Sequence, residues 1–327
     1  MRSTRIVLLL AVLLVGATST SGRGIPQFDA LFVFGDSLSD IGNDFIGTTA
    51  LGIVPAVPPA GSYFKGRFSN GPVGVEYLWY LMSQRPPDTP GALKPFLASP
   101  VIPQRGGLSF AFGGAGTGLT TNLGPFSVPG LTAQVGLFAV ADRLRPAPRK
   151  SLYVVMSGSN DYLPSPAQGV QMDVAIPVGN IVKAIKGLYL TGARHIMVVD
   201  LYDLGAIPLV SRDEDKDLRD LLTLLSNQHN VLLAQALNDL RLPGLTLYPV
   251  HLSDAEALLP PLIEAPALAA LTGSPEAAIC LFVNPATCPT LTPLQFQEGS
   301  AFFWWDAEHP TTTVHAAIGQ HLFDSLR

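Results

Sequence analysis

Short apolar runs that end in a small or polar residue recur along the chain. A run of this length, apolar at nearly every position, is typical of a strand in a parallel sheet that is covered on both faces. The runs that predict such strands are Ala30–Phe34, Leu108–Phe112, Leu152–Met156, His195–Val199 and Leu245–Val250.

Between these runs, apolar residues recur at three- and four-residue spacing, which predicts amphipathic helices. The predicted helices are 73–82, 131–144, 180–190, 217–240 and 311–326, the last one capped by the cluster Thr311–Thr313. Alternating strands and helices predict an α/β fold, a three-layer sandwich. In open parallel sheets, binding sites form at the carboxyl ends of the strands.

The N-terminus has a different pattern. Two arginines in Met1–Arg5 precede an unbroken run of ten apolar residues, Ile6–Val15, and then the small and polar Gly16–Gly22. This order is typical of a secretory signal peptide, and the run is too short to cross a bilayer; an N-terminal membrane anchor is the alternative. We therefore expect a signal peptide over residues 1–22, a single domain over 23–327, and a secreted or periplasmic protein.

Amino-acid composition and charge exclude several classes of protein. Charged residues are 14% of the chain and the net charge is −5, so neither a disordered chain nor a nucleic-acid-binding protein is expected. No segment after the first 22 residues reaches about 18 consecutive apolar positions, so no stable membrane span is expected. Proline-rich stretches at 55–59, 86–95 and 285–293 are interpreted as loops inside the domain.

Cys280 and Cys288 are the two cysteines of the chain. In an oxidising compartment we expect them to form a disulfide, with two free thiols as the alternative. No histidine lies near the two cysteines in the sequence, and the chain has no His-Glu-x-x-His motif, so we expect no metal site.

Three motifs at predicted strand ends carry candidate chemistry. The first motif is Gly35-Asp36-Ser37-Leu38-Ser39-Asp40. On a turn between strand and helix, the Ser37 hydroxyl would project from the edge of the sheet, and the helix N-terminus would offer N–H groups to an oxyanion. The alternative is that Ser37 is only the N-cap of that helix. Gly113-Gly114-Ala115-Gly116 would let a backbone N–H approach a ligand, or simply form a tight loop. Asn160, in Gly158–Asp161, could donate its amide to an anionic oxygen, or simply form a turn.

A fourth motif, Asp306–Pro310, lies near the C-terminus. A carboxylate three residues before His309 can bond the imidazole Nδ1 and leave Nε2 to act as a base on a serine. Glu308 is the alternative orienting acid. For His195, His229 and His251 we expect structural roles. His315 and His321, on the last predicted helix, are expected at the surface or at the edge of the core.

Taken together, these four motifs resemble the blocks of the GDSL family, also called SGNH hydrolases. Gly66-Arg67-Phe68-Ser69-Asn70-Gly71, followed by Glu76-Tyr77-Leu78, is similar to the plant-type branch. The resemblance runs from about residue 30 to residue 322 and implies a three-layer α/β/α sandwich with a mainly parallel, flavodoxin-like sheet. The proline-rich insertion at 255–299 has no role in the family pattern.

The resemblance also implies residue roles. Ser37 would be the nucleophile, His309 the base and Asp306 its orienting acid. Ser37 N–H, Gly114 N–H and the Asn160 amide would form the oxyanion hole, with Gly113 as the alternative to Gly114. No cofactor is implied.

The expected activity is hydrolysis of carboxylic esters, with a small-molecule or lipid ester as the substrate. Trp304 and Trp305 could line an acyl pocket or pack in the core. Carbohydrate O-deacetylation and acyl transfer on the same site are alternatives, as is a non-catalytic secreted binding protein.

Overall fold

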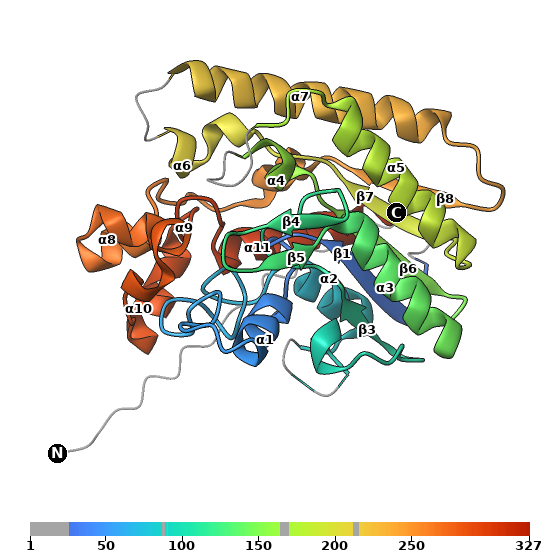
Figure 1. Cartoon of the computed structure of the whole chain (residues 1–327), viewed down its shortest axis with the longest axis horizontal. Helices are drawn as coiled ribbons and strands as arrows, with labels where there is room; N and C mark the ends of the chain where they lie inside the picture. Colours follow the sequence, from blue (N-terminus) through green and yellow to red (C-terminus); the bar gives the residue numbers. More distant parts are fainter. Residues whose placement is uncertain (1–25, 87–88, 90, 164–169, 212–215) are drawn as a thin grey trace, which may run out of the picture.

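A computed structural model describes residues 26–86, 89, 91–163, 170–211 and 216–327 (Figure 1). Its centre is a six-stranded parallel sheet with the order β2-β3-β1-β6-β7-β8. The strands are β1 (Ala30–Gly35), β2 (Leu93–Pro95), β3 (Gly106–Ser109), β6 (Ser151–Met156), β7 (His195–Val199) and β8 (Thr246–Val250). A separate antiparallel hairpin joins β4 (Thr120–Asn122) and β5 (Ser127–Pro129).

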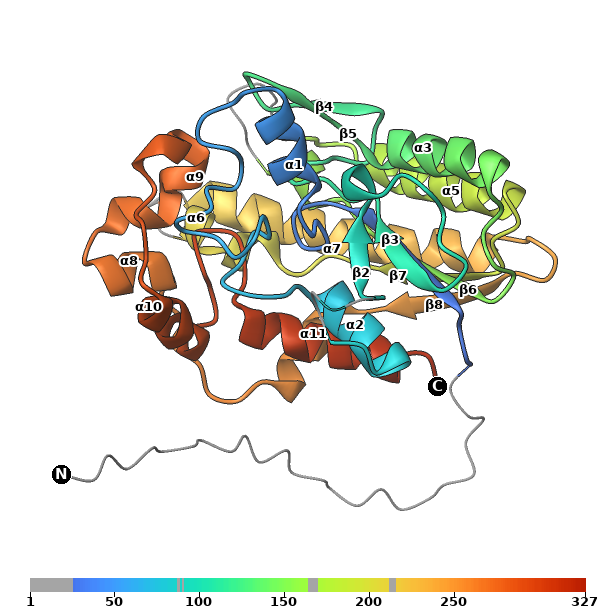
Figure 2. The ribbon, with the colours of Figure 1, turned by 90° about the horizontal axis from the view of Figure 1, so that it is seen from below.

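Alternate residues of the central strand face opposite layers. Phe32 and Phe34 pack toward α3 (Leu131–Leu144), α5 (Ala175–Leu190) and α7 (Lys216–Asp239). Leu31 and Val33 pack toward α2 (Gly74–Ser83) and α11 (Thr312–Asp324). Figures 1 and 2 show the two sets of helices on opposite faces of the sheet, so the predicted α/β/α sandwich is confirmed.

The strand order explains where a site can form. Without the edge strand β2, the order β3-β1-β6-β7-β8 is the flavodoxin-like order 2-1-3-4-5, in which the chain reverses direction across the sheet at β1 and β6. The loops that follow these two strands diverge and leave a crevice between them. Ser37 follows β1 and Asn160 follows β6, so both lie at this point.

Most predicted elements are present, with some corrections. The strand predicted over Leu108–Phe112 is instead β3 and ends at Ser109. Beyond Ser109, Phe110 N and Phe112 N still donate to Val33 O and Gly35 O of β1, at 2.7 and 3.3 Å, while the carbonyls of Ser109 and Ala111 accept from Asn43 Nδ2, at 2.8 and 2.9 Å. The stretch 86–95, interpreted as a loop, contains the edge strand β2, where Pro95 is tolerated because an edge strand needs fewer donors.

The helices also need corrections. Helix α5 begins at Ala175 rather than at residue 180. Thr311 occupies the N-cap of α11, but its hydroxyl donates to Phe302 O and does not cap the helix. His315 is fully buried and its Nδ1 accepts from Gly74 N, so it is a core residue rather than a surface or core-edge one.

The insertion at 255–299 folds into short helices around a small core. Its apolar residues Leu268 and Leu291 pack with Tyr63 and Trp305. Cys280 and Cys288 are joined by a disulfide, as predicted. Its α-helices α8 (Ala267–Thr272), α9 (Cys280–Val283) and α10 (Pro293–Glu298) lie together at one end of the molecule in both views (Figures 1 and 2).

The remaining elements are short. The α-helices are α1 (Asn43–Ala50), α4 (Ser159–Tyr162), α6 (Pro208–Ser211), α8 (Ala267–Thr272), α9 (Cys280–Val283) and α10 (Pro293–Glu298). The 3-10 helices are η1 (Phe96–Ala98), η2 (Leu204–Ala206), η3 (Leu252–Leu258), η4 (Pro275–Ile279), η5 (Pro285–Thr287) and η6 (Gly299–Ala301). Within the described ranges, no helix is both long and apolar enough to cross a membrane. The predicted signal peptide, 1–22, lies outside the described residues.

Candidate active site

Ser37 lies in a tight turn directly after β1. The Asp36 carbonyl accepts hydrogen bonds from Ser39 N at 3.1 Å and Asp40 N at 2.9 Å, and Asp36 Oδ1 accepts from Leu38 N at 3.1 Å. These bonds hold Ser37, which is 9% exposed, at the carboxyl end of the strand. Helix α1 begins only at residue 43, with Gly42 as its N-cap, so the turn does not open directly into a helix as predicted, and Ser37 is not an N-cap.

The two glycines of the next loop have different surroundings. Gly113 N donates to Asp40 Oδ2 at 3.2 Å. Gly114 has a φ of 71°, in the left-handed region that favours glycine, and its N–H has no hydrogen-bond partner among the described residues. Of the two, Gly114 has the N–H available for a ligand.

Asn160 lies in α4 and is tied to the glycine loop. Its Nδ2 donates to Ala115 O at 3.3 Å. The neighbouring Asp161 accepts hydrogen bonds from Thr117 N and Thr117 Oγ1, both at 2.9 Å. These contacts connect the ends of β3 and β6 across the crevice.

Asp306 and His309 form a buried pair. His309 Nδ1 is 2.8 Å from Asp306 Oδ2, and Asp306 Oδ1 accepts from the backbone N–H of His309 at 2.7 Å. Asp306 is fully buried and His309 is 4% exposed. Since Asp306 occupies Nδ1, Nε2 is the nitrogen left for a serine. Glu308 makes no hydrogen bond to the ring in the described structure.

Tyr63 adds a contact to this pair that the sequence analysis missed. Its hydroxyl donates to Asp306 Oδ2 at 2.7 Å, and the side chain is fully buried. Trp305 Nε1 donates to Ser62 O at 3.0 Å, and Leu291 N to Gly61 O at 2.9 Å, which fix the Tyr63 segment. The carboxylate is therefore held from two sides.

Two phenylalanines, also missed, pack on the imidazole of His309. The Phe282 ring is stacked at 5.9 Å between centroids with an interplanar angle of 12°, and Phe68 is tilted at 5.2 Å. Phe282 belongs to α9 of the disulfide-containing insertion, and Ala307 N donates to Ala278 O of the same insertion at 2.9 Å. The insertion thus contacts the His309 loop directly.

The motif Gly66–Gly71 has a structural role besides supplying Phe68. Arg67 Nη2 forms a buried ion pair with Glu76 Oε1 of α2 at 2.6 Å. Asn70 Oδ1 accepts from Thr312 N, at the start of α11, at 2.8 Å. The motif joins these two helices to the His309 loop.

The electrostatics of the site are dominated by buried carboxyls. Burial by itself lowers the pKa of His309, but the Asp306 carboxylate at Nδ1 reverses this and raises it above the ordinary value. Burial raises the pKa of Asp36 to about 7, against the hydrogen bond from Leu38 N. Burial likewise raises the pKa of Glu308 to about 7.

Ser37, Asn160 and His309 line one pocket, which we call the catalytic pocket, together with Asp36, Leu38, Ser159, Leu163, Tyr202 and Glu308. Ser37 Oγ and His309 Nε2 are not joined by a hydrogen bond in the described structure. Catalytic hydrogen bonds often shorten only when the substrate binds, so this does not exclude His309 as a base. A serine, an oriented imidazole and free N–H donors can together support attack on a carbonyl group. Among the described residues, no group of three or more His, Cys, Asp and Glu is placed to hold a metal ion.

The paired tryptophans differ in role. Trp304 lines a second pocket, whereas Trp305 is fully buried in the core of the insertion. The idea that both could line a pocket is therefore wrong for Trp305.

We compared the chain with known protein families, curated proteins and solved structures. The family model described as GDSL-like Lipase/Acylhydrolase matches residues 31–322. A phosphatidylcholine-sterol acyltransferase of Aeromonas hydrophila is 26% identical over 94% of this chain and 92% of its own. The GDSL esterase/lipase At2g42990 of Arabidopsis thaliana is 27% identical over 98% of this chain and 96% of its own. The solved structure of Axe2, an acetylxylan esterase from Geobacillus stearothermophilus, covers 93% of this chain and 96% of its own, with 13% identity and a TM-score of 0.42.

Proposed function

The chain belongs to the family of GDSL-like lipases and acylhydrolases and is an ester hydrolase, and on this premise we propose that it cleaves carboxylic esters through Ser37, His309 and Asp306. The observation that carries the proposal is the hydrogen bond of 2.8 Å between His309 Nδ1 and Asp306 Oδ2, because the His309 side chain lines the same pocket as Ser37.

In the first half-reaction, Ser37 Oγ attacks the ester carbonyl carbon while His309 Nε2 accepts the hydroxyl proton. Asp306 holds the ring and stabilises the imidazolium that forms. The N–H groups of Ser37 and Gly114 and the Asn160 amide would bind the oxyanion. Losing one such donor typically costs about 2.7–4 kcal/mol of transition-state stabilisation.

Collapse of the tetrahedral intermediate breaks the bond to the alcohol oxygen, and His309 gives that oxygen the proton. Water then attacks the acyl-enzyme, with His309 as base again, and the acid leaves while Ser37 regains its proton. His309 is needed in both half-reactions.

A fluorophosphonate probe tests the nucleophile. We expect labelling of the wild-type protein at Ser37 and no labelling of Ser37→Ala, which should also lose nearly all hydrolysis of p-nitrophenyl acetate. Ser39→Ala is the matched control, because this serine lies in the same turn but is fully buried. Labelling of folded Ser37→Ala at the wild-type rate would exclude Ser37 as the nucleophile.

Acyl transfer is a second candidate, because a relative aligned over nearly its whole length is named an acyltransferase. An alcohol would then replace water in the second half-reaction. Product analysis with increasing alcohol tests this: the ester product should increase at the expense of free acid.

We also propose that residues 23–327 form one catalytic domain that is exported after removal of about the first 17–24 residues. The charged, apolar and small-residue order of residues 2–22 supports export, and so does the disulfide, which persists in an oxidising compartment. N-terminal sequencing of secreted protein is the test, and material that begins at Met1 would contradict the proposal.

A further inference from the structure

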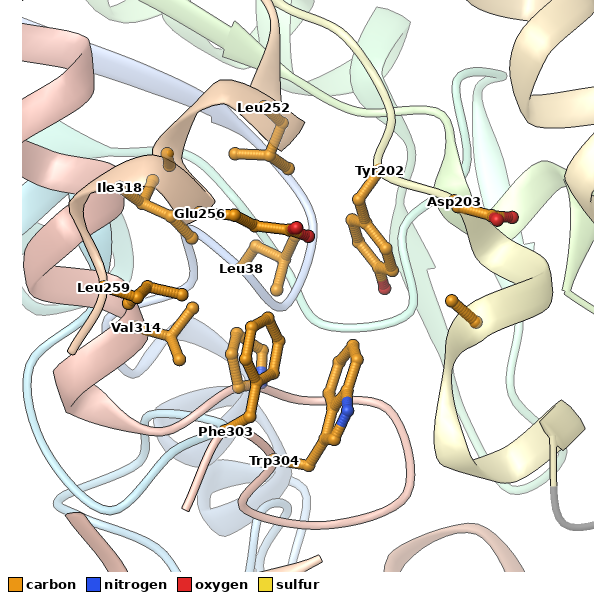
Figure 3. A pocket seen from close by; sticks show the side chains of 13 residues that line it. Leu38, Tyr202, Asp203, Leu252, Glu256, Leu259, Phe303, Trp304, Val314 and Ile318 are labelled. Atoms are coloured by element: carbon orange, nitrogen blue, oxygen red, sulfur yellow. The ribbon is translucent and has the colours of Figure 1, made fainter. Parts of the chain in front are cut away.

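A second pocket adjoins the catalytic pocket. The two share Leu38 and Tyr202 as walls, and the second has a volume of about 80 Å³ (Figure 3). Its other lining residues are Asp203, Ala206, Leu252, Ala255, Glu256, Leu259, Phe303, Trp304, Pro310, Val314 and Ile318. We call it the aromatic pocket.

Three aromatic rings define this pocket. Figure 3 shows Tyr202 pointing into it from one side, and Phe303 and Trp304 from the other. The ring centroids are 6.2 Å apart for Tyr202 and Trp304, and 4.8 Å apart for Phe303 and Trp304. The remaining walls are mostly aliphatic, so the pocket favours a group that presents methyl or methylene surface.

Two acidic side chains line the aromatic pocket. The Glu256 carboxylate points toward Tyr202 (Figure 3), and Asp203 also lines the pocket. Among the described residues, neither a lysine nor an arginine lines either pocket. Clefts lined by carboxylates attract cations and repel anions.

Aromatic faces, aliphatic walls and an uncompensated carboxylate together match a quaternary ammonium group, which has a methyl surface and a delocalised positive charge. We propose that the aromatic pocket binds the quaternary ammonium head of a choline-type alcohol, so that the esters cleaved include those of cationic amino alcohols. This inference rests on the proposed ester hydrolysis at Ser37.

The position of the pocket places this head on the alcohol side of the ester. Pro310, directly after His309, lines the aromatic pocket, whereas Asn160 and Gly114 do not. The alcohol oxygen must lie near His309, which protonates it when the bond to the carbonyl carbon breaks. The group bonded to that oxygen therefore extends toward Tyr202 and Trp304.

The test compares two acetate esters that differ in one atom and one charge: acetylcholine and its neutral isostere 3,3-dimethylbutyl acetate. We expect kcat/KM to be about tenfold higher for acetylcholine, and the preference to shrink as NaCl is raised. Glu256→Gln should lower kcat/KM for acetylcholine about fivefold more than it lowers kcat/KM for the neutral ester. Glu264→Gln, which removes the same charge from an exposed position outside both pockets, should change neither.

Equal kcat/KM values for the two esters, or a preference that stays about tenfold in Glu256→Gln, would overturn the inference while leaving ester hydrolysis intact. If neither ester nor p-nitrophenyl acetate is cleaved, the proposed function fails instead. In that case, ligand binding to the Ser37→Ala variant still tests whether the aromatic pocket binds a quaternary ammonium group. Choline chloride should change the tryptophan fluorescence saturably, through Trp304, and 3,3-dimethylbutanol should not. The absence of a saturable choline signal in that variant would also overturn the inference.

Discussion

Tyr63→Phe removes one hydroxyl from the least accessible part of the site. The Tyr63 hydroxyl donates to Asp306 Oδ2 at 2.7 Å, and both side chains are fully buried. The phenylalanine ring fills nearly the same volume, so packing against Phe68, at 6.5 Å between centroids, is retained. The substitution therefore isolates the hydrogen bond from the packing.

The expected effects can be estimated from this geometry. A hydrogen bond to a charged group contributes about 1.5–3 kcal/mol, so we expect a loss of that size in the free energy of unfolding. The bond is present both before and during the reaction, so kcat should fall less, about fivefold, or ~1 kcal/mol in the barrier.

The pH dependence of kcat/KM distinguishes an effect on His309 from a loss of stability. Asp306 raises the pKa of His309, and the Tyr63 hydroxyl draws some negative charge away from that carboxylate. Without the hydroxyl, protonated His309 is stabilised more strongly and its pKa rises further. Because only neutral His309 acts as a base, the rising limb of kcat/KM should move to higher pH, by roughly half a pH unit, which corresponds to ~0.7 kcal/mol.

The assay is kcat/KM for p-nitrophenyl acetate from pH 5 to 9, together with urea unfolding. Tyr77→Phe is the matched control, because the Tyr77 hydroxyl is 2.8 Å from Thr312 Oγ1, in a contact between α2 and α11. It should lose stability without moving the pH limb. If Tyr63→Phe and Tyr77→Phe give the same pH profile as the wild type, Tyr63 only supports the fold and does not tune His309.

Three further predictions concern the catalytic pair, the disulfide and Glu308. His309→Ala should reduce kcat/KM more than Asp306→Asn, because the base acts in both half-reactions and the acid only orients it; a greater loss for Asp306→Asn would contradict these roles. Replacing Cys280 and Cys288 together with serine should lower the free energy of unfolding by about 2.5 kcal/mol, the chain-entropy value for a loop of this length, and urea unfolding that matches the wild type would refute this. Burial raises the pKa of Glu308 to about 7, so the folded state keeps a proton that the unfolded chain releases near pH 4.5, and stability falls as the pH rises from 4.5 through 7. Because Glu308 is only partly buried, Glu308→Gln should remove a small part of this fall, on the order of 1 kcal/mol, in thermal unfolding measured against pH. An unchanged slope would contradict a raised pKa for Glu308.

The sheet and its helices were largely predictable from local patterns. Strands covered on both faces must be apolar at nearly every position, and that requirement is visible in a window of five residues. For this reason β1, β6, β7 and β8 match their predicted ranges closely, and α3 matches exactly. Elements whose stability comes from neighbours rather than from their own pattern were missed, namely the edge strand β2 and the hairpin of β4 and β5.

The candidate site likewise contains residues that the sequence identified and residues that it did not. Ser37, Asn160 and His309 were recognisable because each lies in a short motif beside residues that serve the same site. Tyr63 and Phe282 have no such motif, and their functional partners lie far away in sequence: 243 residues separate Tyr63 from Asp306.

The insertion at 255–299 shows what only the tertiary structure decided. Its sequence indicated loops and a disulfide, with no role in the site. Packing around Trp305 brings Phe282 onto His309 and, through Leu291 and Gly61, steadies the segment that carries Tyr63. Sequence patterns predicted which groups could react. The long-range contacts that hold those groups, and the walls of the aromatic pocket, depend on chain segments that meet only when the protein folds.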